Sequence, residues 1–428
     1  MTAEIAIMNR HAVVLAADSA TTVTSWKDGN QERRYFKGAN KLFELSRSEP
    51  VGLMIYGSAG LQGVPWELAI KAFRDLLGAE THDELSGYAS HFFDFVEHHE
   101  KLFTADQKLK SLANLIGAAS WRLQSMILGI LNVEAANAQD LPLDQFERAL
   151  EQVSNIVNDM ELNSLLTEAD VASAVATLAE SYNHAVAQQL HLFSSSPDRH
   201  HLIPIFTKTL VTLAVKQFCD FADRTGLVIA GYGKGDFYPV LEVYECYGFL
   251  GDRLIFERKT DNSHKMDSNA AAIIQPFATT SMIDTFRFGV APDAFGAVYE
   301  SSRESLAEFA RLIVDECGGA NAIPQSRMDE LVESARDAHT DVWFQKTRSQ
   351  HFTPLSNVIH SLPIPDMAGL AKSLIELESL KERVTKPSES VSGPIDVAVI
   401  SKFDGFVWID RKHYFKPEFN PRFMKRIK

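Results

Sequence analysis

The segment Thr2–Thr22, which reads TAEIAIMNRHAVVLAADSATT, predicts a β-hairpin at the start of the chain. It contains two apolar runs, Ile5–Ile7 and Ala12–Ala17, separated by a short polar stretch. Apolar runs on either side of a tight polar turn are typical of two paired antiparallel strands. A hairpin of this size brings its two outer ends together, so we expect Thr2 to lie beside Asp18.

Outward from this hairpin, strand and helix patterns follow one another in blocks. A second strand pair is expected at 41–56, after a polar stretch at 27–34 that is read as a loop. Because antiparallel hairpins dominate, the expected fold class is α+β, with two antiparallel sheets covered by helices on both outer faces. The expected boundaries are 1–80 for the N-terminal half of the core, 81–202 for a helical insertion, 203–299 for a core helix and second-sheet strands, 300–363 for a second helical insertion, 364–410 for a core helix and terminal hairpin, and 411–428 for a basic tail.

The composition argues against several classes of protein. The net charge of −14 argues against a broad nucleic-acid-binding face, because phosphate binding needs clustered Lys and Arg. The first residues lack a signal-peptide pattern, and no run reaches the roughly eighteen apolar residues of a membrane span. A cytoplasmic protein that binds neither nucleic acid nor a membrane is therefore expected.

Cysteine and histidine spacing gives no metal pattern. Cys219, Cys246 and Cys317 are too widely spaced for a disulfide framework or a CxxC motif, which favours a reducing compartment. The stretches HHE at 98–100 and HH at 200–201 lack metal-ligand spacing and fall on polar segments, which favours solvated side chains. We expect no metal and no cofactor.

The hairpin carries a family resemblance. Ala12–Thr22 resembles the first hairpin of proteasome β-type subunits and of the bacterial HslV protease, which belong to the Ntn-hydrolase class. In that family the nucleophilic Thr precedes an Asp by sixteen residues, and Thr2 and Asp18 keep that separation. Similar segments cover about half of the chain, in the order of the family. They are Lys37–Leu42, with Lys41 where the family has the Lys that opens its third strand, Tyr56–Gly60 at the junction that supplies an oxyanion-binding amide, Leu227–Tyr232 in the fifth strand, and Ser390–Ile400 in the late Ser-Gly turn and ninth strand.

The chain also departs from the family pattern. Glu389 stands where the family usually has Asp, and the loop between Thr22 and Lys41 is longer than usual. The chain is about twice as long as a typical subunit. Only Met1 precedes Thr2, whereas α-type subunits carry a longer N-terminal helix, so the resemblance is to the β type.

The resemblance implies a fold and a chemistry. The fold is that of the Ntn hydrolases, an αββα four-layer sandwich, here with helical insertions. After removal of Met1, Thr2 attacks an amide carbonyl and forms an acyl-Thr ester. Its own α-amine is the base, since a free α-amino group has a pKa of about 7.7–8.0. The implied catalytic residues are Thr2, Asp18 and Lys41, with Gly57 as the oxyanion-binding amide and Glu389 and Ser392 positioning the amine.

The resemblance also implies a substrate and partners. The substrate is a peptide or an unfolded protein, and the enzyme is a self-compartmentalising homo-oligomer, served by an ATPase or another regulator. The residues implied to line the substrate pocket are small or apolar, which favours a hydrophobic side chain before the cut. They are Thr21, Thr22, Ala39, Ile55 and Ala59.

Two alternative functions stay open. One is an inactive assembly subunit that keeps the fold and never exposes Thr2. The other is a nucleotide-binding protein that uses the Gly57–Gly63 loop, although this loop has neither the GxGxxG spacing nor a following GK[ST]. The insertion at 81–202 follows the helix after Gly60, so we expect it to form a subunit contact or a lid over the Thr2 site.

Overall fold

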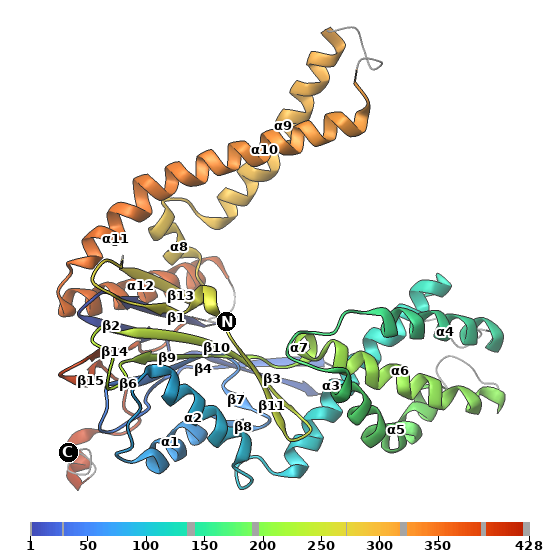
Figure 1. The fold of residues 1–428 in the computed structure, drawn as a ribbon, viewed down its shortest axis with the longest axis horizontal. Helices are drawn as coiled ribbons and strands as arrows, with labels where there is room; N and C mark the ends of the chain where they lie inside the picture. The colour runs from blue at the N-terminus through green and yellow to red at the C-terminus, as the bar shows by residue number, and fades with distance from the viewer. Residues whose placement is uncertain are drawn as a thin grey trace.

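The structure is a computed structural model that describes residues 2–27, 30–134, 142–190, 197–270, 272–316, 323–386 and 391–422. It is an α+β fold with antiparallel sheets, which confirms the predicted fold class. In Figure 1 the sheets form the body, helices lie above and below them, and two helical parts extend away from the body.

The first sheet is built around the predicted N-terminal hairpin. β1 (Ala3–Met8) and β2 (Ala12–Ala17) pair antiparallel, with Glu4 opposite Ala17. Asn9 lies in the turn, and its buried side-chain amide donates hydrogen bonds to the carbonyls of Ile359 (3.0 Å) and Leu362 (3.1 Å), which tie the hairpin to a helix far along the chain. In spatial order the strands are β13 (Ile273–Ala278), β1 (Ala3–Met8), β2 (Ala12–Ala17), β14 (Asp396–Ser401) and β15 (Gly405–Asp410).

The second sheet contains the predicted strand pair at 41–56 and is also antiparallel. Its face toward the first sheet shares one apolar core with it, in which Val13 and Leu15 meet Met54 and Val228. In spatial order the strands are β11 (Arg253–Arg258), β10 (Val240–Leu250), β9 (Thr225–Gly231), β6 (Val51–Gly57) and β5 (Leu42–Glu44), and β12 (His264–Lys265) also pairs with β10.

Helices cover the outer face of each sheet (Figure 1). On the first sheet they are α8 (Ser281–Phe288), α11 (Thr353–His360) and α12 (Ile364–Thr385), and Met367 and Ala371 of α12 pack on β1 and β2. On the second sheet they are α1 (Trp66–Leu77) and α2 (Leu85–His98), which bury Trp66, Phe73 and Phe92 against β6 and β9. The apolar stripe on each helix accounts for this packing.

A further helical unit packs around an apolar core that it shares with Tyr247 and Leu250 at the end of β10 and Ile255 in β11. It includes α3 (Ala105–Leu131), α4 (Leu143–Asp159), α5 (Glu168–Leu190), α6 (Ile203–Lys216) and α7 (Phe218–Phe221). This packing differs from the boundaries expected at 81 and 202. α2 belongs to the layer on the second sheet, and α6 belongs to the helical unit.

A second helical part extends from the body as a hairpin, shown in orange in Figure 1. It consists of α9 (Pro292–Glu316) and α10 (Gln325–Thr347), and a π-helical turn at Arg348–Phe352 joins α10 to α11. α9 begins before the boundary expected at 300. The remaining short turns are 3-10 helices at Pro197–Leu202, Thr260–Asn262 and Pro417–Phe419.

The prediction of a loop at 27–34 is wrong. β3 (Thr21–Lys27) and β4 (Asn30–Phe36) form a two-stranded ribbon there, which pairs with neither large sheet. Its exposed residues include Val23 and Phe36. A ribbon with solvent on both faces has no apolar-polar alternation, so its sequence looks like that of a loop. Two further short strands, β7 (Gly60–Leu61) and β8 (Val64–Pro65), form a tight hairpin before α1.

Candidate functional site

Strand alternation places the start of β1 at the end of the core between the sheets. Successive residues on a strand point to opposite faces, and Ala6 and Met8 lie in the core that the two sheets share. Thr2 and Glu4 are separated from these two residues by even numbers of positions, so they point to the same face of the strand. Their side chains therefore lie on the side of β1 that faces the second sheet, from which Lys41 approaches.

Asp18 is the structural hub of this site. It is 1% exposed, and its carboxylate accepts hydrogen bonds from the amides of Ala3 (3.2 Å), Ala20 (3.1 Å) and Ser392 (2.9 Å) and from the Lys41 ammonium. Charge-assisted bonds of this kind stabilise a buried carboxylate. Asp18 thus joins the first hairpin, the residue just before β5 and the segment before β14.

Lys41 is buried between two carboxylates. Besides its contact with Asp18, its ammonium lies 3.0 Å from Glu4 Oε1. This second contact is an ion pair without hydrogen-bond geometry, since Glu4 Oε1 has no hydrogen-bond partner among the described residues. The other oxygen, Glu4 Oε2, accepts a hydrogen bond from the Thr2 hydroxyl at 3.2 Å. A continuous chain of polar contacts therefore runs from Thr2 to Asp18.

Burial raises the pKa of Glu4 from its ordinary value of 4.5 to about 7. The Lys41 charge opposes this rise and the Asp18 charge adds to it. One ammonium cannot fully compensate two buried carboxylates, so the second carboxylate holds its proton more tightly. The charge of Glu4 is therefore expected to change near neutral pH, beside the Thr2 hydroxyl that donates a hydrogen bond to it.

Gly57 ends β6 with a backbone that only glycine adopts easily. Its φ is +80°, and a Cβ at this position would lie 2.9 Å from the carbonyl oxygen of Arg224. The next residue, Ser58, donates its amide to that same oxygen at 3.2 Å, and its carbonyl accepts from the Thr225 hydroxyl at 3.1 Å. Trp66 donates to that hydroxyl at 2.9 Å, so the turn is fixed from both sides.

These elements enclose a narrow cleft. Its central space is about 20 Å³, enough for roughly one water molecule. A larger cavity of about 470 Å³ adjoins it, since Ser58 lines both. That cavity lies between the β7–β8 hairpin and α3, which contributes Gln107, Lys110 and Asn114. The narrow cleft is lined by Thr2, Glu4, Ala20, Thr21, Ala39, Asn40, Lys41, Ile55, Tyr56, Gly57, Ser58 and Ala59.

Most of the residues singled out in the sequence come together here. Thr2, Thr21, Lys41, Ala39, Ile55, Gly57 and Ala59 line the cleft, and Asp18 and Ser392 lie behind it through their contacts with Lys41 and with each other. Thr22 is the next residue along β3 and does not line the cleft. Glu389 lies outside the described residues.

Glu4 is the functional candidate that sequence reasoning missed. The signal was present, because Glu4 is the only charged residue in the otherwise apolar strand Ala3–Met8. A charged side chain that is fully buried without full compensation is costly, which makes it a candidate for function.

The glycines of the Gly57–Gly63 loop do not lie at a helix N-terminus. Gly60 and Gly63 belong to the β7–β8 hairpin, and α1 begins only at Trp66, after Pro65. The Trp66 amide already donates to the carbonyl of Ala59 at 3.1 Å. A phosphate-binding loop instead directs free backbone amides at a helix N-terminus toward its ligand.

Comparison with models of protein families finds no match for the chain, and comparison with curated proteins finds no similar sequence. Among the described residues, no helix combines the length and the apolar character needed to cross a membrane.

Proposed function

We propose that this chain is an N-terminal threonine hydrolase of the Ntn type, which cleaves amide bonds through an ester with Thr2. The observation that carries the proposal is the chain of contacts from the Thr2 hydroxyl through Glu4 and Lys41 to Asp18. Two facing antiparallel sheets with helices on both outer faces support the four-layer Ntn sandwich as the fold.

The chemistry follows from the groups present. Removal of Met1 frees the α-amine of Thr2, which takes the proton from the Thr2 hydroxyl as its oxygen bonds to the substrate carbonyl carbon. The amide C–N bond then breaks, and the leaving amine takes that proton. Water hydrolyses the ester and restores Thr2. Lys41 stabilises the negative charge on the Thr2 oxygen, and Asp18 holds Lys41 in place.

Glu4 acts as a positioning residue in this scheme. Its carboxylate accepts the hydrogen bond of the Thr2 hydroxyl and so orients the nucleophile toward the cleft. The amide of Gly57, a residue that lines the cleft, is the proposed donor to the tetrahedral oxyanion. Oxyanion stabilisation is usually the largest single catalytic contribution.

The two adjoining cavities suggest how a peptide lies in the site. Ala39, Ile55 and Ala59 line the narrow cleft and suit a small apolar side chain next to the scissile bond. The larger polar cavity beside Ser58 accommodates the continuing backbone, and α3 forms one wall of it. In this arrangement the helical unit restricts which substrates reach Thr2.

A homo-oligomer is part of the proposal. The projecting α9–α10 hairpin exposes large apolar side chains, which a second copy of the chain would cover. They include Phe309, Leu312 and Ile313 on α9 and Leu331 and Val342 on α10. Light scattering of the untagged protein tests this part independently of activity.

The experiment that tests the function combines intact mass with a covalent probe. The untagged protein is expected to begin at Thr2 and to gain the mass of one epoxyketone or β-lactone inhibitor. Thr2→Ala should remove both the labelling and the hydrolysis of a fluorogenic peptide with a hydrophobic residue before the cut. Thr177→Ala, an exposed threonine on α5, is the matched control and should leave both unchanged.

The outcomes separate the two remaining functions. Full retention of Met1 together with a lack of labelling would contradict the hydrolase and favour an inactive assembly subunit. Labelling that persists in Thr2→Ala would show that another nucleophile reacts, and the assignment of Thr2 would fail.

A further inference from the structure

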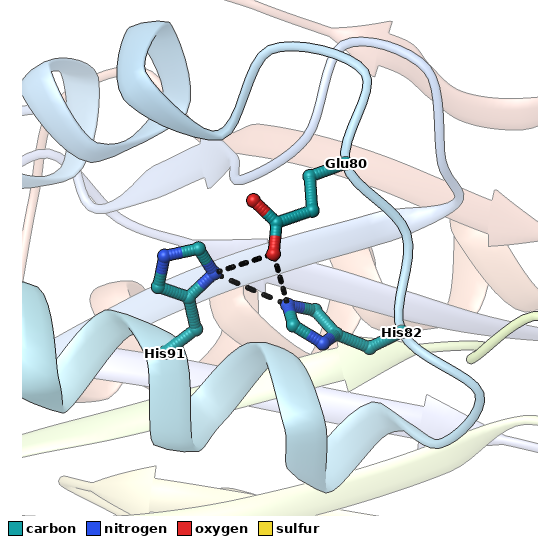
Figure 2. Close-up of side chains that lie close together, drawn as sticks. All are labelled: Glu80, His82 and His91. Atoms are coloured by element: carbon teal, nitrogen blue, oxygen red, sulfur yellow. Dashed lines mark hydrogen bonds and ion pairs between the residues drawn. The ribbon is translucent and has the colours of Figure 1, made fainter.

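Three side chains outside the Thr2 cleft converge on one point (Figure 2). Glu80 and His82 come from the segment between α1 and α2, and His91 comes from α2. His82 Nε2 lies 3.2 Å from His91 Nδ1, and Glu80 Oε1 lies 3.7 Å from His91 Nδ1 and 3.9 Å from His82 Nε2. Each residue therefore presents one donor atom to the same small space.

The donor types and spacings match those of a metal centre. Two imidazole nitrogens and one carboxylate oxygen form a His₂Glu set, which binds Zn²⁺ at about 2.0–2.2 Å per ligand. Tetrahedral geometry at these bond lengths separates the donors by roughly 3.3 Å. The two histidine nitrogens already have this separation, and the two distances to Glu80 need to shorten by only about half an ångström. We propose that Glu80, His82 and His91 bind a divalent transition-metal ion, with Zn²⁺ the ion that the set suits best.

The backbone around the cluster is already fixed in place. The carbonyl of His82 accepts from the Lys234 amide at 2.9 Å, and the next carbonyl, of Asp83, accepts from the Gly235 amide at 2.9 Å. The His82 amide donates to the Tyr88 hydroxyl at 3.2 Å. Ligand positions that are held before the ion arrives lower the ordering cost of binding.

Gly87 makes room for the His82 ring. A Cβ on this residue of α2 would lie 2.7 Å from His82 Cβ and 3.0 Å from His82 Cγ. Glycine is a poor helix former, yet here it allows His82 to lie close against the helix that carries His91. The rings also pack edge-on against neighbours, His82 on Tyr88 and His91 on Phe73, which limits their rotation.

An ion bound here would link two elements of the fold. It would clamp the segment after α1 onto α2, within the helical layer that covers the second sheet. Glu80 is exposed, so three protein ligands leave a fourth position for water. Without an ion, one imidazole must donate its N–H to the other across the 3.2 Å contact, and binding replaces that hydrogen bond by two metal bonds.

The test is a metal titration of the untagged, full-length protein after treatment with a chelator. Isothermal calorimetry with ZnCl₂ should show a single ion per chain, and CoCl₂ should produce the visible absorption of a low-symmetry Co²⁺ site. His82→Ala and His91→Gln should each weaken Zn²⁺ binding by more than about tenfold, the lower limit known for losing even an outer partner of a ligand. The melting temperature should rise with Zn²⁺ in the wild type and stay unchanged in these variants.

Matched variants separate a metal site from general effects. His98→Ala removes an exposed histidine of the same helix, paired with Asp94 at 3.3 Å, and should bind Zn²⁺ like the wild type. Gly87→Ala should weaken binding without removing a ligand, because it displaces the His82 ring. If a histidine variant fails to fold by circular dichroism, Glu80→Gln at an exposed position provides the same comparison. Absence of saturable Zn²⁺ binding by the wild type, or equal binding by His82→Ala and His98→Ala, would overturn the proposal.

Discussion

Replacing Glu4 by Gln should remove a specific pH dependence from the stability of β1 and β2. The pKa of Glu4 is about 7 in the folded chain against 4.5 ordinarily, so the folded state binds this proton more tightly than the unfolded state does. The resulting stability is fully present below pH 4.5 and is lost as the pH rises through about 7. At about 1.4 kcal/mol per pH unit, the difference between the two pKa values corresponds to on the order of 3 kcal/mol.

Hydrogen exchange of the Ala3–Ala17 hairpin is the suitable assay, because a chain with several cores need not unfold in one step. The protein carries Met1, retained by inhibiting methionine aminopeptidase and verified by intact mass. After correction for intrinsic exchange rates, the opening free energy should fall between pH 5 and pH 8 by about 2.5 kcal/mol more in the wild type than in Glu4→Gln.

A control variant and a refuting result complete this experiment. Glu308→Gln replaces an exposed acid whose pKa is held below its ordinary value by Arg311, so it should change nothing between pH 5 and pH 8. If the wild type and Glu4→Gln differ by the same free energy at both pH values, Glu4 does not titrate in this range, and the reasoning from two carboxylates around one ammonium is wrong.

Three further predictions concern the site and its support. Lys41→Met should slow peptide hydrolysis by about 10²–10⁴-fold, because the negative charge on the Thr2 oxygen loses the cation that stabilises it. Lys372→Met, which removes an ion-paired surface lysine, is the control, and unchanged turnover in Lys41→Met would contradict the prediction. Gly57→Ala and Gly63→Ala should each lower the free energy of unfolding by about 1–3 kcal/mol, because both glycines have a positive φ. Gly57→Ala should lower the melting temperature further, because its new Cβ would meet the Arg224 carbonyl, and equal effects of the two variants would argue against that contact. Asn9→Ala should lower the opening free energy of the first hairpin by about 1–3 kcal/mol, as measured by hydrogen exchange, because the carbonyls of Ile359 and Leu362 lose their hydrogen bonds. The control Asn420→Ala, which loses one exposed hydrogen bond, should change it by less than about 0.5 kcal/mol.

The sequence predicts the elements that have one solvent-exposed face and one buried face, and those that are buried on both faces. The first hairpin, α1 from Trp66 to Leu77 and the terminal hairpin of β14 and β15 follow their periodicity directly. The ribbon of β3 and β4 does not, because solvent on both sides removes the alternation. Helices were expected in the regions of α2 and α6, but α2 was assigned to the insertion and α6 to the main core, and the structure packs them the other way, since an apolar stripe does not specify its partner.

The candidate site divides in the same way. Spacing and resemblance singled out Thr2, Asp18 and Lys41, which the structure brings together. Glu4 was missed because its place beside Lys41 depends on the register between two sheets, which no local pattern encodes. The cluster of Glu80, His82 and His91 was missed for a related reason. Its ligands lie on a loop and a helix whose contact depends on Gly87 and on the Gly233–Gly235 turn.

Removal of Met1 changes the charge balance on which Glu4 depends. With Met1 in place, two carboxylates face a single ammonium, and burial keeps the pKa of Glu4 near 7. A free α-ammonium on Thr2 would add a second positive charge beside Glu4, whose Oε2 already contacts the Thr2 hydroxyl. Two cations then balance two carboxylates, which lowers the pKa of Glu4 and keeps it ionised as an acceptor for the nucleophile. The pH dependence described for the Met1-bearing chain should therefore shrink in the processed form while the α-amine is protonated. The neutral form of the same amine, which has a pKa of about 7.7–8.0, then supplies the base.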